Sequence, residues 1–138
     1  TYALWLEKVR SDLDIANTLP GKAAAYTYFY LREDDMKIIG MVNIRLELTD
    51  FLRKEGGHIG YSIRPTERGK GYGTKMLREV LKIFGRIGIN SIIVTCDKKN
   101  IASAGVIKNC GGVLDSEFYS KTYGEVLQRY SIAVCSEK

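Results

Sequence analysis

The sequence predicts one α/β domain with a mixed β-sheet and helices on both of its faces. Three strand-like runs with short connections favour an antiparallel meander, and the strand–helix–strand–helix succession that the third run begins favours a right-handed parallel crossover. The length of 138 residues fits one hydrophobic core and is too short for two ordinary domains. We therefore expect a single domain over residues 1–138, with an incomplete N-terminus because the chain does not begin with Met.

The first half of the chain is predicted to hold one helix and three strands. Residues 4–13 carry apolar side chains at helical spacing, which predicts an amphipathic helix, and a turn at residues 17–22, marked by a Pro-Gly pair, follows it. The expected strands, rich in aromatic or alternating apolar residues, lie at residues 26–32, 37–48 and 58–64. The acidic run 33–35 joins the first two of these strands, and Pro65 ends the third.

The second half is predicted to hold two helices and three strands. Apolar residues at helical spacing from Tyr72 to Phe84 predict the first helix, which Gly85 and Gly88 close. Asn100 is the predicted N-cap of the second helix, which stops at Gly111. The expected strands lie at residues 91–96, 113–120 and 126–134, and the β-branched composition of the first predicts burial on both of its faces.

The composition excludes several classes of protein. No apolar run approaches the ~20 residues that a membrane span needs, and the first residues lack the pattern of a secretory signal. The three cysteines, Cys96, Cys110 and Cys135, are widely spaced and form no C-x-x-C pair, which argues against a disulfide framework and against a zinc site. We therefore expect a cytoplasmic protein that contacts no membrane and holds no metal.

The positive charge of the chain is concentrated in one stretch. The net charge is +5, and residues 64–99 hold nine Lys and Arg against three Asp and Glu. A charge gathered in this way suggests an anionic partner, such as a phosphorylated cofactor, a nucleic acid or a membrane surface. A solvated helix face is the alternative explanation.

A glycine-rich turn lies at the start of this basic stretch, between a predicted strand and a predicted helix. Gly69, Gly71 and Gly73 allow the backbone to approach a ligand closely, and the first amides of a helix have no partners within it. With the charges of Arg68 and Lys70, they form a nest suited to a phosphate or diphosphate. The glycine spacing is neither that of the P-loop nor that of the Rossmann fingerprint.

The segment Arg-Gly-Lys-Gly-Tyr-Gly, from Arg68 to Gly73, resembles the R/Q-x-x-G-x-G/A acetyl-CoA motif of the GCN5-related N-acetyltransferase (GNAT) family. Its setting is similar too, because the family places this motif between a strand and a long helix and follows it with a strand and a helix that starts at Asn. Here Asn100 and Ser103 occupy the family's N-x-x-A/S positions. The resemblance runs from about residue 26 to residue 134, and it implies a GNAT-like acyl-CoA N-acyltransferase fold that lacks the family's first strand and helix.

The resemblance implies acetyl-CoA as cosubstrate and no metal. The amides of residues 69–74 would receive the diphosphate, the backbone at residues 61–63 would hold the pantetheine arm and polarise the thioester, and Asn100 and Ser103 would contact the pantetheine or thiol end. The implied cofactor-binding residues are Tyr61, Ile63, Arg68, Gly69, Lys70, Gly71, Tyr72, Gly73, Thr74, Asn100 and Ser103.

The catalytic residues are the least determined part of this prediction. The attacking amine must be neutral, and an ordinary lysine-type amine has a pKa near ~10.4, so a base or a proton path is required. His58, the only histidine, is the predicted base, with Glu55 as a weaker candidate and an uninvolved strand histidine as the alternative. Family members often carry a Tyr that protonates the departing thiolate, but Ile107 occupies that position here, so the acid is not identified, and bulk water and another Tyr are the open alternatives. Cys96 is expected to pack in the core rather than act as a nucleophile.

We therefore predict an N-acetyltransferase that transfers the acetyl group of acetyl-CoA to a primary amine by direct attack in a ternary complex. A basic nucleic-acid-binding module is one alternative, although residues 64–99 show no aromatic–basic repeat. A catalytically degenerate CoA-binding sensor is another, because a fold does not determine a function. The expected partner is a small-molecule or peptide amine rather than a nucleic acid, and formation of a homodimer stays open.

Overall fold

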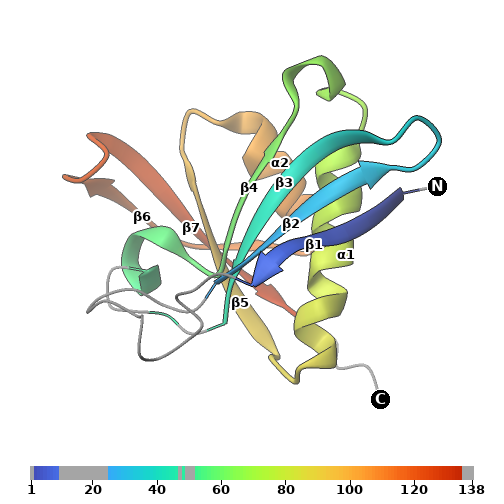
Figure 1. Ribbon diagram of the computed structural model, residues 1–138. Helices are drawn as coiled ribbons and strands as arrows, with labels where there is room; N and C mark the ends of the chain where they lie inside the picture. The colour runs from blue at the N-terminus through green and yellow to red at the C-terminus, as the bar shows by residue number, and fades with distance from the viewer. Residues whose placement is uncertain (1, 10–24, 47, 49–51, 135–138) are drawn as a thin grey trace.

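The computed structural model describes residues 2–9, 25–46, 48 and 52–134 (Figure 1). Within these ranges the strands form two sheets, and the ladders that build both sheets are antiparallel. The α/β class predicted from the sequence is confirmed. None of the helices in these ranges combines the length and the apolar character of a membrane span.

The first sheet has four strands in the order β1-β2-β3-β4. Their bounds are Tyr2–Val9 for β1, Ala25–Arg32 for β2, Lys37–Arg45 for β3 and Ile59–Ile63 for β4. Side chains alternate between the faces, so that Val42 and Ile44 of β3 are buried while Met41 is exposed. The β2–β3 turn is held by Arg32, which donates two hydrogen bonds to the carboxylate of Asp35, at 2.9 and 2.7 Å.

The second sheet has three strands in the order β5-β7-β6. Their bounds are Ser91–Asp97 for β5, Val113–Ser120 for β6 and Glu125–Ala133 for β7. Strand β5 buries Ile92, Val94 and Cys96, while the residues between them are partly exposed. The prediction that this strand is buried on both faces is therefore wrong, because β5 is an edge strand whose second face is only partly covered.

Two α-helices pack on these sheets. Helix α1 (Tyr72–Arg86) contacts β3 and β4, and α2 (Ile101–Asn109) contacts β5 and α1. A π-helical turn, η3 (Leu52–Gly56), precedes β4, and a 3-10 turn, η4 (Pro65–Glu67), follows it. The apolar stripe of α1 is at most 1% exposed at Met76, Leu77, Val80 and Phe84. Burial of each such side chain contributes about 1.5–3 kcal/mol, and the resulting core includes residues of both sheets.

Strands β4 and β5 lie side by side at one end only. The main-chain N–H of His58 donates to the Ile93 carbonyl at 2.7 Å, and the Ile93 N–H donates to His58 Nδ1 at 2.8 Å. Among the described strands no ladder joins β4 to β5, so the expected parallel pairing of the crossover is wrong. The imidazole takes the Ile93 N–H that a ladder would need. Figure 1 shows the two strands diverging from this point toward their C-terminal ends, which leaves one edge of β4 without a neighbouring strand.

The N-terminal segment also differs from its prediction. The sequence predicts a helix over residues 4–13, but residues 2–9 form β1, which pairs antiparallel with β2. Apolar spacing in a short segment is ambiguous, and the backbone groups at the edge of β2 provide partners that favour a strand. The expectation that the fold lacks its first strand is therefore wrong as well, because β1 fills that place. Residues 10–24, which include the predicted Pro-Gly turn, lie outside the described residues.

Candidate active site

The glycine-rich turn connects β4, through η4, to the N-terminus of α1. Gly69 and Gly71 have φ angles of 77° and 80°, a left-handed conformation that a side chain would strain. A Cβ built on either glycine has no heavy atom within 4 Å, so this side of the turn is open. At Gly73 a Cβ would lie 3.0 Å from Val106 Cγ2, so the missing side chain lets α1 approach α2 closely.

The main-chain amides of this turn are available to a ligand. Among the described residues, no protein acceptor receives a hydrogen bond from the amides of residues 69–74. The amide of Arg68, just before them, donates to the Pro65 carbonyl at 3.4 Å. Consecutive unpaired amides at the positive end of a 15-residue helix form a site for an anion such as a diphosphate.

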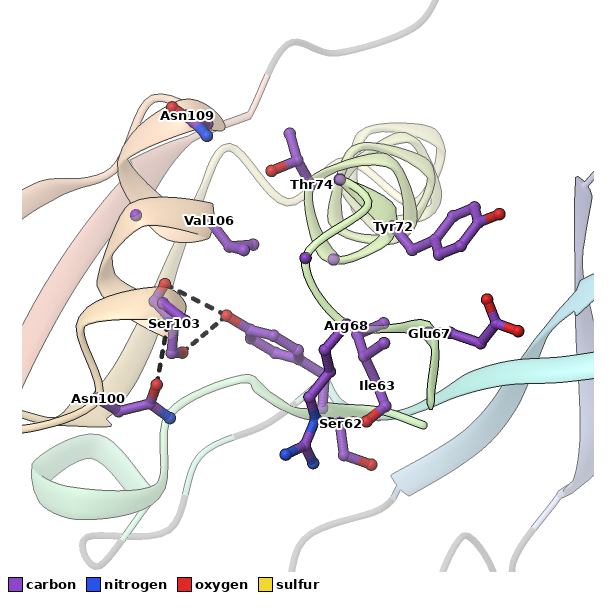
Figure 2. Close-up of a pocket in the computed structure, with 16 residues that line it drawn as sticks. Ser62, Ile63, Glu67, Arg68, Tyr72, Thr74, Asn100, Ser103, Val106 and Asn109 are labelled. Carbon is purple, nitrogen blue, oxygen red and sulfur yellow. Dashed lines mark hydrogen bonds between the residues drawn. The ribbon is translucent and has the colours of Figure 1, made fainter. Parts of the chain in front are cut away.

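A pocket of about 670 Å³ opens between this turn, β4 and α2 (Figure 2). Its volume lies in the range of small-molecule and cofactor sites, ~300–1,000 Å³. Of the predicted cofactor-binding residues, the structure brings to this pocket Tyr61, Ile63, Arg68, Gly69, Gly71, Tyr72, Gly73, Thr74, Asn100 and Ser103. Lys70 does not line the pocket.

The pocket is also lined by residues outside the predicted set, which are Ser62, Glu67, Ala102, Gly105, Val106 and Asn109. Val106 and Asn109 of α2 face the pocket together with Ser103, as Figure 2 shows. Steps of three residues from Ser103 reach both positions, and such steps stay on one helix face. The helical spacing therefore contained a signal for this part of the wall.

A buried carboxylate lies beneath the turn. The side chain of Glu67 is 4% exposed, and its oxygens lie 3.4 Å from Arg32 Nη1, 3.2 Å from Lys37 Nζ and 3.0 Å from Lys70 Nζ. The hydrogen bonds from Lys70, Lys37 and Arg32 lower the pKa of Glu67 to about 2. The charge of Lys70 is thus directed at Glu67, and the ion cluster ties the β2–β3 hairpin to the turn. The sequence contained no local signal for this cluster.

The two residues that border the glycines differ in orientation. The Arg68 side chain is exposed at the pocket, where its Nε donates to the Ile63 carbonyl at 2.9 Å. Figure 2 shows the hydroxyl of Tyr72 directed away from α2. That hydroxyl is 3.2 Å from the Tyr2 hydroxyl and accepts from Arg32 Nη1 at 3.3 Å, and these hydrogen bonds lower the pKa of Tyr72. Tyr72 therefore gives the pocket its ring and backbone rather than its hydroxyl.

Asn100 and Ser103 place polar side chains at the start of the α2 wall. Asn100 is the N-cap of α2, as predicted, because its Oδ1 accepts from the Ser103 amide at 3.1 Å. The Ser103 Oγ lies 2.8 Å from the hydroxyl of Tyr61, which crosses from β4. These contacts join the open end of β4 to the first turn of α2.

The two predicted base candidates are not at the pocket. His58 Nδ1 accepts from the Ile93 amide, and its ring meets Phe84 edge-on with 5.9 Å between the centroids. Burial lowers the pKa of His58, which favours the neutral ring. The Glu55 carboxylate, in η3, accepts hydrogen bonds from the hydroxyls of Ser120 and Thr122. Neither side chain is brought to the residues that line the pocket.

Two further expectations concern the interior of the domain. Ile107, at the position where the family often has Tyr, is 0% exposed, and it contributes no polar group. Cys96 is buried, and burial raises the pKa of its thiol, which disfavours a nucleophilic thiolate. Both residues belong to the hydrophobic core.

In this pocket, unpaired amides at a helix N-terminus lie beside a strand edge that no described strand covers. The chain belongs to the GNAT acetyltransferase family: the family described as "Acetyltransferase (GNAT) domain" matches residues 4–113. The resemblance noted in the sequence is confirmed. A comparison with curated proteins finds no match.

Solved structures share the fold. The ribosomal L7/L12 α-N-protein acetyltransferase RimL, in complex with coenzyme A, has a TM-score of 0.67 at 18% identity, and the match covers 82% of this chain and 64% of RimL. The ribosomal-protein-S5-alanine acetyltransferase from Vibrio fischeri has a TM-score of 0.67 at 24% identity, with 80% of this chain and 62% of that protein covered. The spermidine/spermine N-acetyltransferase SpeG from Vibrio cholerae has a TM-score of 0.68 at 15% identity, with 96% and 95% covered. This chain thus spans less than two thirds of the first two proteins.

Proposed function

We propose that this chain is an N-acetyltransferase that transfers the acetyl group of acetyl-CoA to a primary amine by direct attack in a ternary complex. One observation carries the proposal: a single pocket combines the unpaired amides of residues 69–74 with the open edge of β4 at Tyr61 and Ile63. A diphosphate and an arm that carries amide groups require these two features side by side. Membership of the GNAT family supports the same conclusion.

The proposed binding of acetyl-CoA follows the shape of the pocket. The diphosphate binds the amides of residues 69–74, and the exposed guanidinium of Arg68 adds positive charge. The pantetheine arm extends along β4, where its amides pair with the main chain of Tyr61 and Ile63 in place of a neighbouring strand. Because Lys70 Nζ lies 3.0 Å from the Glu67 carboxylate, its contribution to phosphate binding stays a prediction.

The proposed reaction begins with the lone pair of a neutral amine, which attacks the thioester carbonyl carbon. As the C–N bond forms, negative charge develops on the carbonyl oxygen, and a main-chain N–H of β4 near Ile63 stabilises it. The C–S bond then breaks, and the amide product and CoA leave without an acyl-enzyme. His58 as the general base stays a prediction, and its engaged Nδ1 does not favour that role.

The proposed acceptor is a primary amine on a small molecule or a peptide. SpeG is named for spermidine and spermine, and RimL for the α-amine of a ribosomal protein. Both kinds of acceptor carry an amine that must lose a proton before attack. The cytoplasmic location and any homodimer also stay predictions.

Thermal unfolding tests the binding of acetyl-CoA. At 100 times its dissociation constant, a ligand stabilises the native state by about 2.7 kcal/mol, so we expect the Tm to rise by several degrees. Gly71→Leu removes this rise, because its side chain enters the open side of the turn. Gly88→Leu is the matched control, since Gly88 has a φ of 82° and open space around its Cβ at the other end of α1. No Tm rise with the unmodified chain, or equal rises in both variants, contradicts the proposal.

Release of the CoA thiol tests the transfer. We expect turnover with at least one amine of a panel that contains spermidine, spermine and short peptides with a free Ala N-terminus. Acetyl-CoA binding without thiol release for any amine would favour the CoA sensor. Salt-dependent binding of an oligonucleotide without any acetyl-CoA effect would favour the nucleic-acid-binding module.

A further inference from the structure

Two hydroxyl groups meet at the α2 side of the pocket. The Tyr61 hydroxyl lies 2.8 Å from Ser103 Oγ and 3.4 Å from the Ser103 carbonyl, and the dashed lines at Ser103 in Figure 2 mark both contacts. Tyr61 and Ser103 both line the pocket, and both are partly buried. This pair therefore places hydroxyl groups that can donate a hydrogen bond or a proton at the wall along which the proposed pantetheine arm lies.

The hydroxyl of Tyr61 contacts the α2 wall of the pocket, whereas the hydroxyl of Tyr72, the other tyrosine that lines the pocket, does not. The hydroxyl of Tyr72 is engaged by Tyr2 and Arg32 on the far side of α1. Burial raises the pKa of Tyr61, and the hydrogen bond to Ser103 opposes that shift. The titratable groups near Tyr61 are the thiols of Cys96 and Cys110, which are themselves half-buried or buried. Tyr61 consequently keeps its proton at neutral pH.

The phenol at this face of α2 comes from β4, because α2 itself carries no phenol there. Ser103 and Ile107 are four residues apart and share a face of α2, but Ile107 is 0% exposed and carries no proton. A phenol that crosses from the open end of β4 reaches the same face from the opposite side of the pocket. Asn100 fixes Ser103 in turn, because its Oδ1 caps the Ser103 amide.

We propose that Tyr61, held in place by Ser103, is the catalytic residue that donates a proton to the departing thiolate of CoA. The inference rests on the proposed acetyl transfer. When the C–S bond breaks, its electron pair goes to sulfur, the O–H bond of Tyr61 breaks and an S–H bond forms. The phenolate then regains a proton from solvent, which has taken up the proton released by the amine. The sum of these steps is amine plus acetyl-CoA giving amide plus CoA.

Binding measurements made without any amine test whether Tyr61 contacts the sulfur of CoA. Dissociation constants of CoA and of desulfo-CoA, which lacks the sulfur, are measured at pH 9, where a thiol with a pKa near ~8.5 is largely ionised. A hydrogen bond to a charged group predicts that the unmodified chain prefers CoA by about tenfold. Tyr61→Phe reduces this preference to less than twofold. Tyr119→Phe, which removes an exposed phenol of β6, leaves it unchanged.

Kinetics test the proton transfer itself. With the best amine of the panel, Tyr61→Phe lowers kcat by about 100-fold or more, the contribution typical of a general acid, while the KM for acetyl-CoA changes less than threefold. A structural role alone would change KM and the Tm together with kcat. If Tyr61→Phe does not fold, Ser103→Ala carries both tests, because it removes the Oγ contact that positions the phenol, keeps the Tyr61 ring, and should lower both the preference for CoA and kcat.

The outcomes separate this inference from the proposed function. If CoA and desulfo-CoA bind with equal affinity to the unmodified chain, or if Tyr61→Phe retains the preference and the kcat, the role of Tyr61 is wrong and acetyl transfer stands. If neither CoA nor acetyl-CoA binds the unmodified chain, the proposed function itself is wrong.

Discussion

Strand β4 meets β5 differently at its two ends. At the closed end, His58 exchanges hydrogen bonds with Ile93, and the Thr95 hydroxyl donates to the Glu55 carbonyl at 2.6 Å. At the open end, Tyr61 pairs with Val42 of β3 on one side, but no strand of the described chain lies on its other side, and its hydroxyl reaches α2 instead. The closed end holds the two sheets together, and the open end forms the pocket.

This difference shows how an incomplete sheet creates a pocket. Backbone groups inside a sheet are normally paired, and pairing leaves nothing for a ligand. Where β4 and β5 diverge, no described strand pairs with this edge of β4, and the Ile63 carbonyl accepts from the Arg68 side chain instead, at a place where the amides at the start of α1 are also unpaired. The hydrogen bonds at the closed end fix the relative positions of β4 and β5, and they thereby fix the shape of the gap between the two strands.

The largest expected effect is at Gly57, which belongs to the closed end. Gly57 has a φ of 69°, and a Cβ there would lie 2.6 Å from the Ile93 carbonyl oxygen. We expect Gly57→Val to lower the free energy of unfolding by about 3 kcal/mol or more, because backbone strain and a displaced Ile93 add together. Gly124→Val is the control, since Gly124 has a φ of 67° and open space around it. Urea denaturation that shows equal losses for both variants would refute the role of the closed end.

The next largest effect is expected where α1 and α2, which form two walls of the pocket, contact each other. Gly73→Leu forces a side chain against Val106, whose Cγ2 lies 3.0 Å from the built Cβ, and should cost about 1–3 kcal/mol of stability. Val106→Ala in the same chain should restore at least half of that loss. A double-mutant cycle measured by urea denaturation tests this coupling, and strictly additive losses would mean that the walls do not touch here.

A smaller effect is expected at the cap of α2. Asn100→Ala removes the acceptor of the Ser103 amide and should lower the free energy of unfolding by about 1 kcal/mol. Asn100→Asp keeps an acceptor and should retain most of the stability. Denaturation midpoints of the two variants provide the measurement, and equal midpoints would show that the cap contributes little.

The smallest effect is a pH dependence at His58. Burial lowers its pKa below 6.5 in the native state, so the unfolded chain binds a proton more readily. The stabilisation is therefore complete above pH ~6.5 and is lost as the pH falls toward the native pKa, by at most about 1.4 kcal/mol per pH unit for one group. His58→Gln should flatten the Tm between pH 7 and pH 5.5 (about one unit below the ordinary value). A variant that keeps the slope of the unmodified chain would assign it to another group.

The features that the sequence predicts correctly are those that depend only on residues close together in the chain. The conformations of Gly69 and Gly71 and the amides that follow depend on their own residues, and the Asn100 cap involves atoms only three residues apart. Strand β1 was predicted as a helix because its partner, β2, is distant in the sequence. The apolar spacing of residues 4–13 carried no information about that partner.

The same reasoning applies to the charged and titratable residues. Lys70 follows Gly69 in the motif, yet the tertiary structure directs it to Glu67 together with Lys37 of β3. His58 suits a base by its ordinary pKa, but the placement of Ile93 engages its Nδ1. Glu67 is only three residues from Lys70, but Arg32 and Lys37 reach it from other elements, and Ile93 likewise reaches His58 from β5.

The amino-acid sequence alone determined the α/β class, the glycine turn with its unpaired amides and the capped second helix, because short-range backbone sterics and hydrogen bonding govern these features. Only the tertiary structure decided that β1 is a strand, that Glu67 lies buried among three cations, that β4 and β5 part beyond His58 and that Tyr61 meets Ser103. These contacts join residues far apart in the chain, and their energies depend on burial and distance, which no local pattern of residues encodes.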